Sequence, residues 1–165
     1  MRYFSVSAAV LAALLASACG TSSSTPVSPS TPTPTVAASV TGTWNGTAAD
    51  TLGADKMSWA VTQTGTAMSG TMSVSDTTRS MMGNGTMTGT MNGNTLTFHM
   101  SVPAGGFGGQ MTSCSMGIDG QGTMSDDGHT MTGTYTGSMS GMMSGGMMGQ
   151  SCGGAMNNGQ FTMTR

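Results

Sequence analysis

The chain has 165 residues, of which only 6% are charged, and its formal net charge is −2 at pH 7. Its four basic residues are scattered along the chain and form no basic stripe, which argues against nucleic acid as a partner. Gly, Ser and Thr supply most of the polar surface, and Glu is absent. This composition disfavours amphipathic helices and favours β-structure with many turns.

Residues 1–18 form a predicted secretory signal peptide. Arg2 carries the positive charge, residues 8–16 supply a short apolar stretch, and Ala16-Ser17-Ala18 fits a small-residue cleavage site. The apolar stretch is shorter than the ~20 residues that a membrane-spanning helix needs. We therefore expect an exported protein.

Cys19 directly follows the predicted cleavage site, and the segment resembles the lipobox of bacterial lipoproteins. The resemblance implies that Cys19 is acylated and becomes the mature N-terminus, which would anchor the protein to a membrane of the bacterial cell envelope. The same bond also fits an ordinary signal peptidase. Cleavage without acylation, however, would leave an odd exposed thiol among the three cysteines of an exported chain.

Residues 19–39 are rich in Ser, Thr and Pro and contain four of the five prolines. Such a tract stays extended and buries little apolar surface. It is interpreted as a tether, and residues 40–165 as one folded domain.

From residue 40 onwards, apolar residues alternate with Thr or Ser, the pattern of half-buried antiparallel strands. Asn92-Gly93 and Asp127-Gly128 are typical hairpin turns, and Asn158-Gly159 leads into the last predicted strand. The eight predicted strands comprise residues 40–44, 57–61, 68–74, 87–91, 96–102, 114–124, 131–135 and 161–165.

Short sequential connections predict an all-β, up-and-down antiparallel meander. Closing it into a barrel of about eight strands removes the sheet edges and buries the apolar face. A two-sheet sandwich is the alternative fold, but its crossovers need longer links than most of those present here.

The segment Val40-Thr41-Gly42-Thr43-Trp44 resembles the first strand of avidin-type barrels, and Gly42-Thr43-Trp44 is similar to the Gly-x-Trp of lipocalins. Both families belong to the calycins. The resemblance implies that a basic residue on the last strand, here Arg165, covers Trp44. The Trp, Asn, Ser and Tyr set of the avidin biotin site is not visible, so the resemblance implies the fold and not biotin binding.

The chain contains twenty methionines, and ten of them fall on the inward phase of the predicted strands. Methionine is an adaptable core residue. We therefore expect these ten to line the barrel interior: Met57, Met68, Met72, Met87, Met91, Met100, Met116, Met124, Met131 and Met163.

Residues 137–152 show no strand pattern and are predicted to form a loop. Thioether sulfur is a soft ligand that prefers Cu(I). Three hypotheses fit the loop. It is low-complexity sequence without a selected role that folds over the barrel mouth, or its methionines take up oxidants as a reversible sulfoxide, or it binds Cu(I) or Ag(I). The metal hypothesis assigns five of its residues as ligands: Met139, Met142, Met143, Met147 and Met148.

Acylation of Cys19 would leave Cys114 and Cys152 as an even pair, which is predicted to form a disulfide in an exported protein. His99 and His129 lack the spacing of a zinc site and are expected on the surface or in a turn. No catalytic motif is present, and the adjacent Asp126 and Asp127 are typical of a turn, so the chain is predicted not to be an enzyme.

The sequence therefore predicts one of two functions. The first is a membrane-anchored barrel that binds a small apolar ligand or has a structural role, without a cofactor. The second is a soft-metal binder that uses the Met-rich loop.

Overall fold

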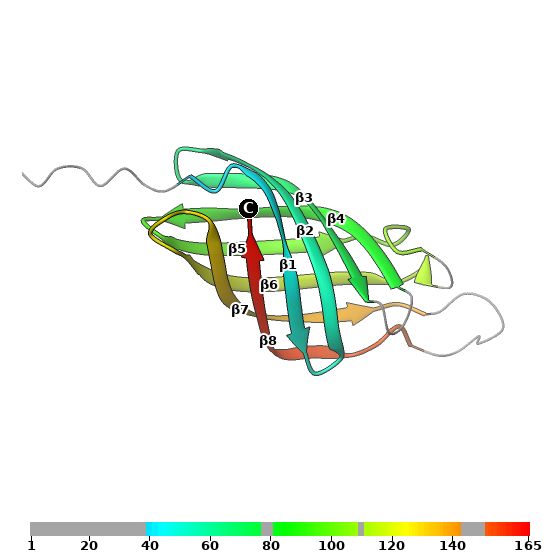
Figure 1. Cartoon of the computed structure of the whole chain (residues 1–165). Coiled ribbons are helices and arrows are strands. Elements are labelled where there is room, and N and C mark those ends of the chain that lie inside the picture. The colour runs from blue at the N-terminus through cyan, green and yellow to red at the C-terminus, as the bar shows by residue number, and fades with distance from the viewer. Residues whose placement is uncertain (1–38, 77–80, 109–110, 143–150) are drawn as a thin grey trace, which may run out of the picture. The chain divides into compact units, whose positions relative to one another are not determined.

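Eight antiparallel strands follow one another around a closed barrel, as Figure 1 shows. The computed structural model describes residues 39–76, 81–108, 111–142 and 151–165, all within one compact unit, Pro34–Arg165. These ranges contain no α-helix. The strands are β1 (Gly42–Asp50), β2 (Gly53–Thr64), β3 (Ala67–Asp76), β4 (Met81–Asn92), β5 (Thr95–Val102), β6 (Ser115–Met124), β7 (Thr130–Ser140) and β8 (Ala155–Thr164).

The first and last strands pair and close the barrel. β1 and β8 are antiparallel neighbours from Asn45↔Thr164 to Ala49↔Gln160, and every other pair joins strands consecutive in sequence. The predicted eight-stranded meander barrel is therefore confirmed. The predicted turns at Asn92-Gly93 and Asp127-Gly128 are confirmed as well, because they connect β4 to β5 and β6 to β7.

Side chains fill the barrel interior. All ten methionines expected on the inward phase are buried. Trp59, Phe98 and Phe161 form an aromatic cluster with ring centroids 5.4–5.5 Å apart. Aromatic rings in tilted or edge-on contact add stability beyond the area they bury. The interior is thus a packed core.

Several strands extend beyond the predicted limits. β1 continues to Asp50, β4 begins at Met81, and β7 continues to Ser140. In these extensions glycine occupies some of the inward-facing positions, as at Gly46, Gly85 and Gly137. Glycine interrupts the apolar pattern of the sequence, but the backbone pairing continues. The prediction that residues 137–140 belong to a loop is therefore wrong.

The dipeptide Asn158-Gly159 does not precede the last strand but lies within β8. The register between β7 and β8 shifts between Tyr135 and Gly137, and Asn158 has a φ of 54°. An inserted residue of this kind is a β-bulge, which bends the strand. A Cβ on Gly159 would lie 2.5 Å from the Tyr135 ring, so glycine is what allows that ring to lie against β8.

Short turns close one end of the barrel, which we call the turn end. There the Trp44 Nε1–H donates to the Val40 carbonyl oxygen at 2.8 Å. The Arg165 guanidinium lies 4.9 Å from the centre of the Trp44 ring and donates from Nη1 to the Thr41 carbonyl oxygen at 3.0 Å. This is the contact that the calycin resemblance implies, and it covers the Trp44 ring at the turn end.

A Met-lined pocket at the loop end of the barrel

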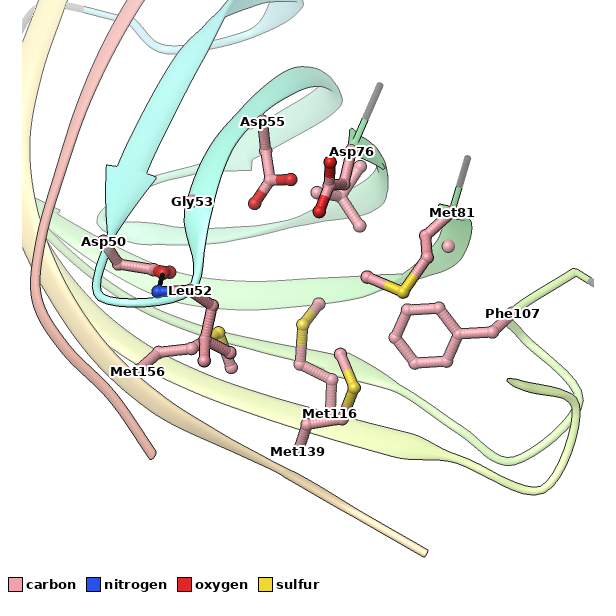
Figure 2. Close-up of a pocket in the computed structure, with 12 residues that line it drawn as sticks. Asp50, Leu52, Gly53, Asp55, Asp76, Met81, Phe107, Met116, Met139 and Met156 are labelled. Atoms are coloured by element: carbon pink, nitrogen blue, oxygen red, sulfur yellow. Dashed lines mark hydrogen bonds between the residues drawn. The ribbon is translucent and has the colours of Figure 1, made fainter. Parts of the chain in front are cut away.

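A small pocket lies at the opposite end of the barrel, where the longer connections gather; we call this the loop end. The space open to the centres of water molecules is about 30 Å³. Aliphatic, aromatic and thioether side chains supply most of the lining, and three carboxylates complete it (Figure 2). The lining residues are Asp50, Leu52, Gly53, Asp55, Val74, Asp76, Met81, Gly83, Phe107, Met116, Met139 and Met156.

Phe107 forms one wall of the pocket and comes from the connection between β5 and β6. The connection runs back along β4: Asn84 N donates to the Gly106 carbonyl oxygen at 2.8 Å, and Gly108 N donates to the Met82 carbonyl oxygen at 3.0 Å. A Cβ on Gly83 would lie 2.6 Å from the Phe107 ring. Glycine at position 83 therefore lets the ring close over the strand.

Three methionines from adjacent strands form the opposite side of the pocket. Met116 on β6 is the direct cross-strand partner of Met139 on β7, and Met156 lies on the neighbouring β8. All three are buried. In Figure 2 Met81, from the start of β4, extends toward Met116 and Met139, and Met156 lies beside Leu52. Four thioethers thus share one cavity.

The remaining part of the lining is acidic. The Asp50 carboxylate accepts hydrogen bonds from Leu52 N at 2.6 Å and from the Tyr135 hydroxyl at 2.8 Å. Burial raises the pKa of Tyr135 above its ordinary value, and the hydrogen bond to Asp50 raises it further. Tyr135 therefore remains a neutral donor at physiological pH and fixes the Asp50 carboxylate at the pocket. Asp76 is buried, and Asp55 lies on β2 nearby (Figure 2).

A disulfide ties together two connections at the loop end. Cys114 and Cys152 are bonded, with their Cα atoms 5.8 Å apart, and the predicted pairing is confirmed. Cys114 immediately precedes β6, and Cys152 lies shortly before β8. The bond therefore links the residues just before β6 and β8, the strands that carry Met116 and Met156.

The five methionines of the loop hypothesis do not form one group in the described residues. Met139 lies on β7 and is buried, since the strand continues through the inward-facing Gly137. Met142 lies beyond the strand, pairs with Ser151 and is 66% exposed. Met143, Met147 and Met148 lie outside the described residues. Sequence reasoning therefore placed Met139 in the wrong element.

Among the described residues, the other titratable side chains lie at the surface. The His99 Nδ1 is 2.8 Å from the Asp119 Oδ1, and both side chains are more than half exposed. Asp127 accepts hydrogen bonds from the Ser125 hydroxyl and the His129 amide, which lower its pKa, as in an ordinary polar turn. Within the described ranges, no three His, Cys, Asp or Glu side chains lie close enough to hold a metal.

Sequence reasoning missed the pocket. Asp50, Met81, Phe107 and Met156 come from four different elements or connections, and no local motif joins them. The one available signal was the inward phase of Met116, which was correctly placed in the interior.

Comparisons with protein families, curated proteins and solved structures found no match for this chain. The closed, all-antiparallel eight-stranded barrel is compatible with a calycin-like fold. In the part of the chain that the structure describes, no helix is both long and apolar enough to span a membrane.

Proposed function

We propose that this chain is a lipid-anchored protein of the bacterial cell envelope whose barrel holds the apolar end of a small ligand in the loop-end pocket. The observation that carries the proposal is the pocket itself. Buried side chains occupy much of the barrel interior, and the pocket leaves space between thioether, aromatic and aliphatic groups. Spaces bounded by apolar side chains can take up apolar groups.

The size of the pocket limits the ligand. A space of about 30 Å³ for water centres is far below the volume of typical sites for drug-sized molecules. An alkyl end or a similar small group fits without rearrangement. Met81 and Met139 can change rotamer to admit more, because methionine has three rotatable side-chain bonds and adapts to its surroundings.

The anchor is proposed from the sequence alone. The signal peptide (residues 1–18), Cys19 and the tether (residues 19–39) would place the barrel at a membrane surface; all but Ser39 lie outside the described residues. Acyl chains stabilise membrane association by ~0.8 kcal/mol per buried CH₂ group, so a multiply acylated Cys19 would hold firmly. The absence of a catalytic arrangement in the sequence fits a binding role.

The anchor is tested by membrane fractionation and intact-protein mass spectrometry. Wild-type protein is expected in the membrane fraction with the mass of acyl groups on Cys19. Cys19→Ser is expected in the soluble exported fraction. If Cys19→Ser remains with the membranes as wild type does, the lipoprotein part of the proposal is wrong.

The pocket is tested with N-phenyl-1-naphthylamine, a neutral apolar dye that fluoresces when it leaves water. The dye as a whole is larger than the space, so it should bind wild type with its phenyl ring in the pocket after Met81 and Met139 change rotamer. Met139→Phe should weaken the binding by filling the pocket. Met142→Phe is the matched control, because Met142 is three residues further along the chain and largely exposed. Equal dye binding by both variants would contradict the assignment of this pocket.

A further inference from the structure

We propose that the thioether sulfurs of Met116, Met139 and Met156, with Met81 at the rim, bind one soft monovalent metal ion, Cu(I) or Ag(I). The site differs from the Met-rich loop of the sequence hypothesis, with which it shares only Met139. It occupies the proposed ligand pocket but does not require that an apolar ligand bind there.

Methionine side chains gather around one small cavity. Four of the twelve lining residues are methionines, and they come from β4, β6, β7 and β8. Met116 and Met139 are directly opposed across β6 and β7, which places their Cβ atoms roughly 4.5–5.5 Å apart. A Cβ on Gly137 would lie 3.1 Å from the Met156 Cε, so glycine on β7 leaves room for the third methionine.

The backbone that carries these side chains is tied by a hydrogen bond and by the disulfide. Met139 N donates to the Gly154 carbonyl oxygen at 3.1 Å, which joins the end of β7 to the residues before β8. The Cys114–Cys152 disulfide fixes the approaches to β6 and β8. Three sulfurs on tied strands need less ordering to converge on one ion than sulfurs on a free segment do.

The size of the cavity suits a single ion. About 30 Å³ for water centres exceeds the 10–15 Å³ needed to hold a water molecule and is far too small for a drug-sized ligand. An ion fits this space, whereas a larger molecule fits only after side chains move.

The chemistry of the lining favours a soft ion. Thioethers are soft, neutral ligands that select Cu(I) over hard divalent ions. Three aspartates line the cavity, but no three His, Cys, Asp or Glu side chains of the described residues are placed so that together they could hold such an ion. A cation surrounded by neutral sulfur also needs nearby negative charge, and Asp50, Asp55 and Asp76 line the same cavity. The pocket thus combines soft ligands with charge compensation for a monovalent cation.

The experiment is an Ag(I) titration of the full chain, followed by calorimetry and by NMR of ¹³C-labelled methionine methyl groups. All samples carry Cys19→Ser, so that its thiol cannot bind the metal, and keep the disulfide intact. The site variant combines Met116→Leu, Met139→Leu and Met156→Leu. The matched control combines Met72→Leu, Met91→Leu and Met100→Leu, which are equally buried positions outside the pocket. A loop variant replaces Met142, Met143, Met147 and Met148 with Leu.

We expect one Ag(I) per chain, and binding at least about 100-fold weaker in the site variant than in the control and loop variants. The methyl signals of the pocket methionines should shift before all others, a readout that needs no variant to fold. Binding should persist at pH 5, because thioethers do not take up a proton, whereas a site built on histidine would weaken there.

The inference is overturned if no Ag(I) binds, if the control or the loop variant loses as much affinity as the site variant, or if other methionine signals shift first. Dye binding to metal-free protein is measured on the same samples. Dye binding without Ag(I) binding would refute the metal site and leave the proposed function standing. Ag(I) binding without dye binding would support the metal site and contradict the proposed binding of an apolar ligand.

Discussion

Removing the Cys114–Cys152 disulfide is expected to destabilise the barrel strongly. The bond joins residues 38 positions apart. The chain-entropy model gives roughly 4 kcal/mol for a closed loop of this length. Both cysteines are buried, so alanine is the better replacement, because serine would bury a hydroxyl group. For a domain of this size, the loss corresponds to a fall in Tm of about 10–20 °C.

The assay is equilibrium unfolding in urea, followed by tryptophan fluorescence, for wild type and for the double variant Cys114→Ala, Cys152→Ala. The double variant should unfold at lower urea, with a larger m-value, since its unfolded chain expands further without the cross-link. Wild type unfolded in the presence of a thiol reductant is the control. It lacks the bond but keeps both side chains, so agreement between the two samples assigns the loss to the cross-link.

A loss below about 1 kcal/mol in both samples would refute this reasoning. It would mean that the unfolded chain already holds these segments close together, or that the loop end contributes little to the cooperative unit. A large loss in the double variant alone would assign the effect to packing of the cysteine side chains.

Three further predictions concern other parts of the barrel. Arg165→Met should lower the free energy of unfolding by about 1–2 kcal/mol, because Trp44 loses its cation–π partner and the turn end loses a hydrogen bond. No change in the urea midpoint would show that Arg165 does not stabilise that end. Tyr135→Phe should cost about 1–2 kcal/mol near neutral pH through the lost hydrogen bond to Asp50, as measured by urea unfolding. The raised pKa of Tyr135 also makes the stability of the barrel depend on pH. The contribution of Tyr135 to the free energy of unfolding is complete below the ordinary pKa of 10.0 and is lost as pH rises above it. Wild type should therefore lose stability more steeply than Tyr135→Phe between pH 9 and 11, and parallel curves would contradict the burial of this hydroxyl. Asn158→Val should destabilise β8 by about 1–3 kcal/mol in thermal unfolding, because the φ of 54° at position 158 disfavours a β-branched residue. Asn158→Gly should be nearly neutral, and equal effects of the two substitutions would argue against the bulge.

The alternation of apolar and hydroxyl residues was sufficient to predict the closed meander, because half-buried strands repeat every two residues. It failed where glycine takes the inward position, as at Gly46 and Gly137, since glycine carries no hydrophobic signal although its backbone still pairs. That failure placed Met139 in a loop and hid its pairing with Met116.

The disulfide could be predicted from the number of cysteines, because only one pairing remains once Cys19 is set aside. The pocket could not be predicted in the same way. Phe107 reaches it through a connection that folds back along β4, and this path depends on the closed barrel. The acidic lining was also missed, because Asp50, Asp55 and Asp76 become neighbours of one cavity only through the pairing of β1, β2 and β3.

The central claim is that a small apolar group binds in the pocket at the loop end of the barrel. The most direct test is NMR of ¹³C-labelled methionine methyl groups during a titration with 1-octanol. We predict that the signals of Met81, Met116, Met139 and Met156 shift together and saturate, while those of Met72, Met87, Met91 and Met100 stay unchanged. Shifts spread over the interior methionines, or no saturable shift at the four pocket methionines, would contradict it.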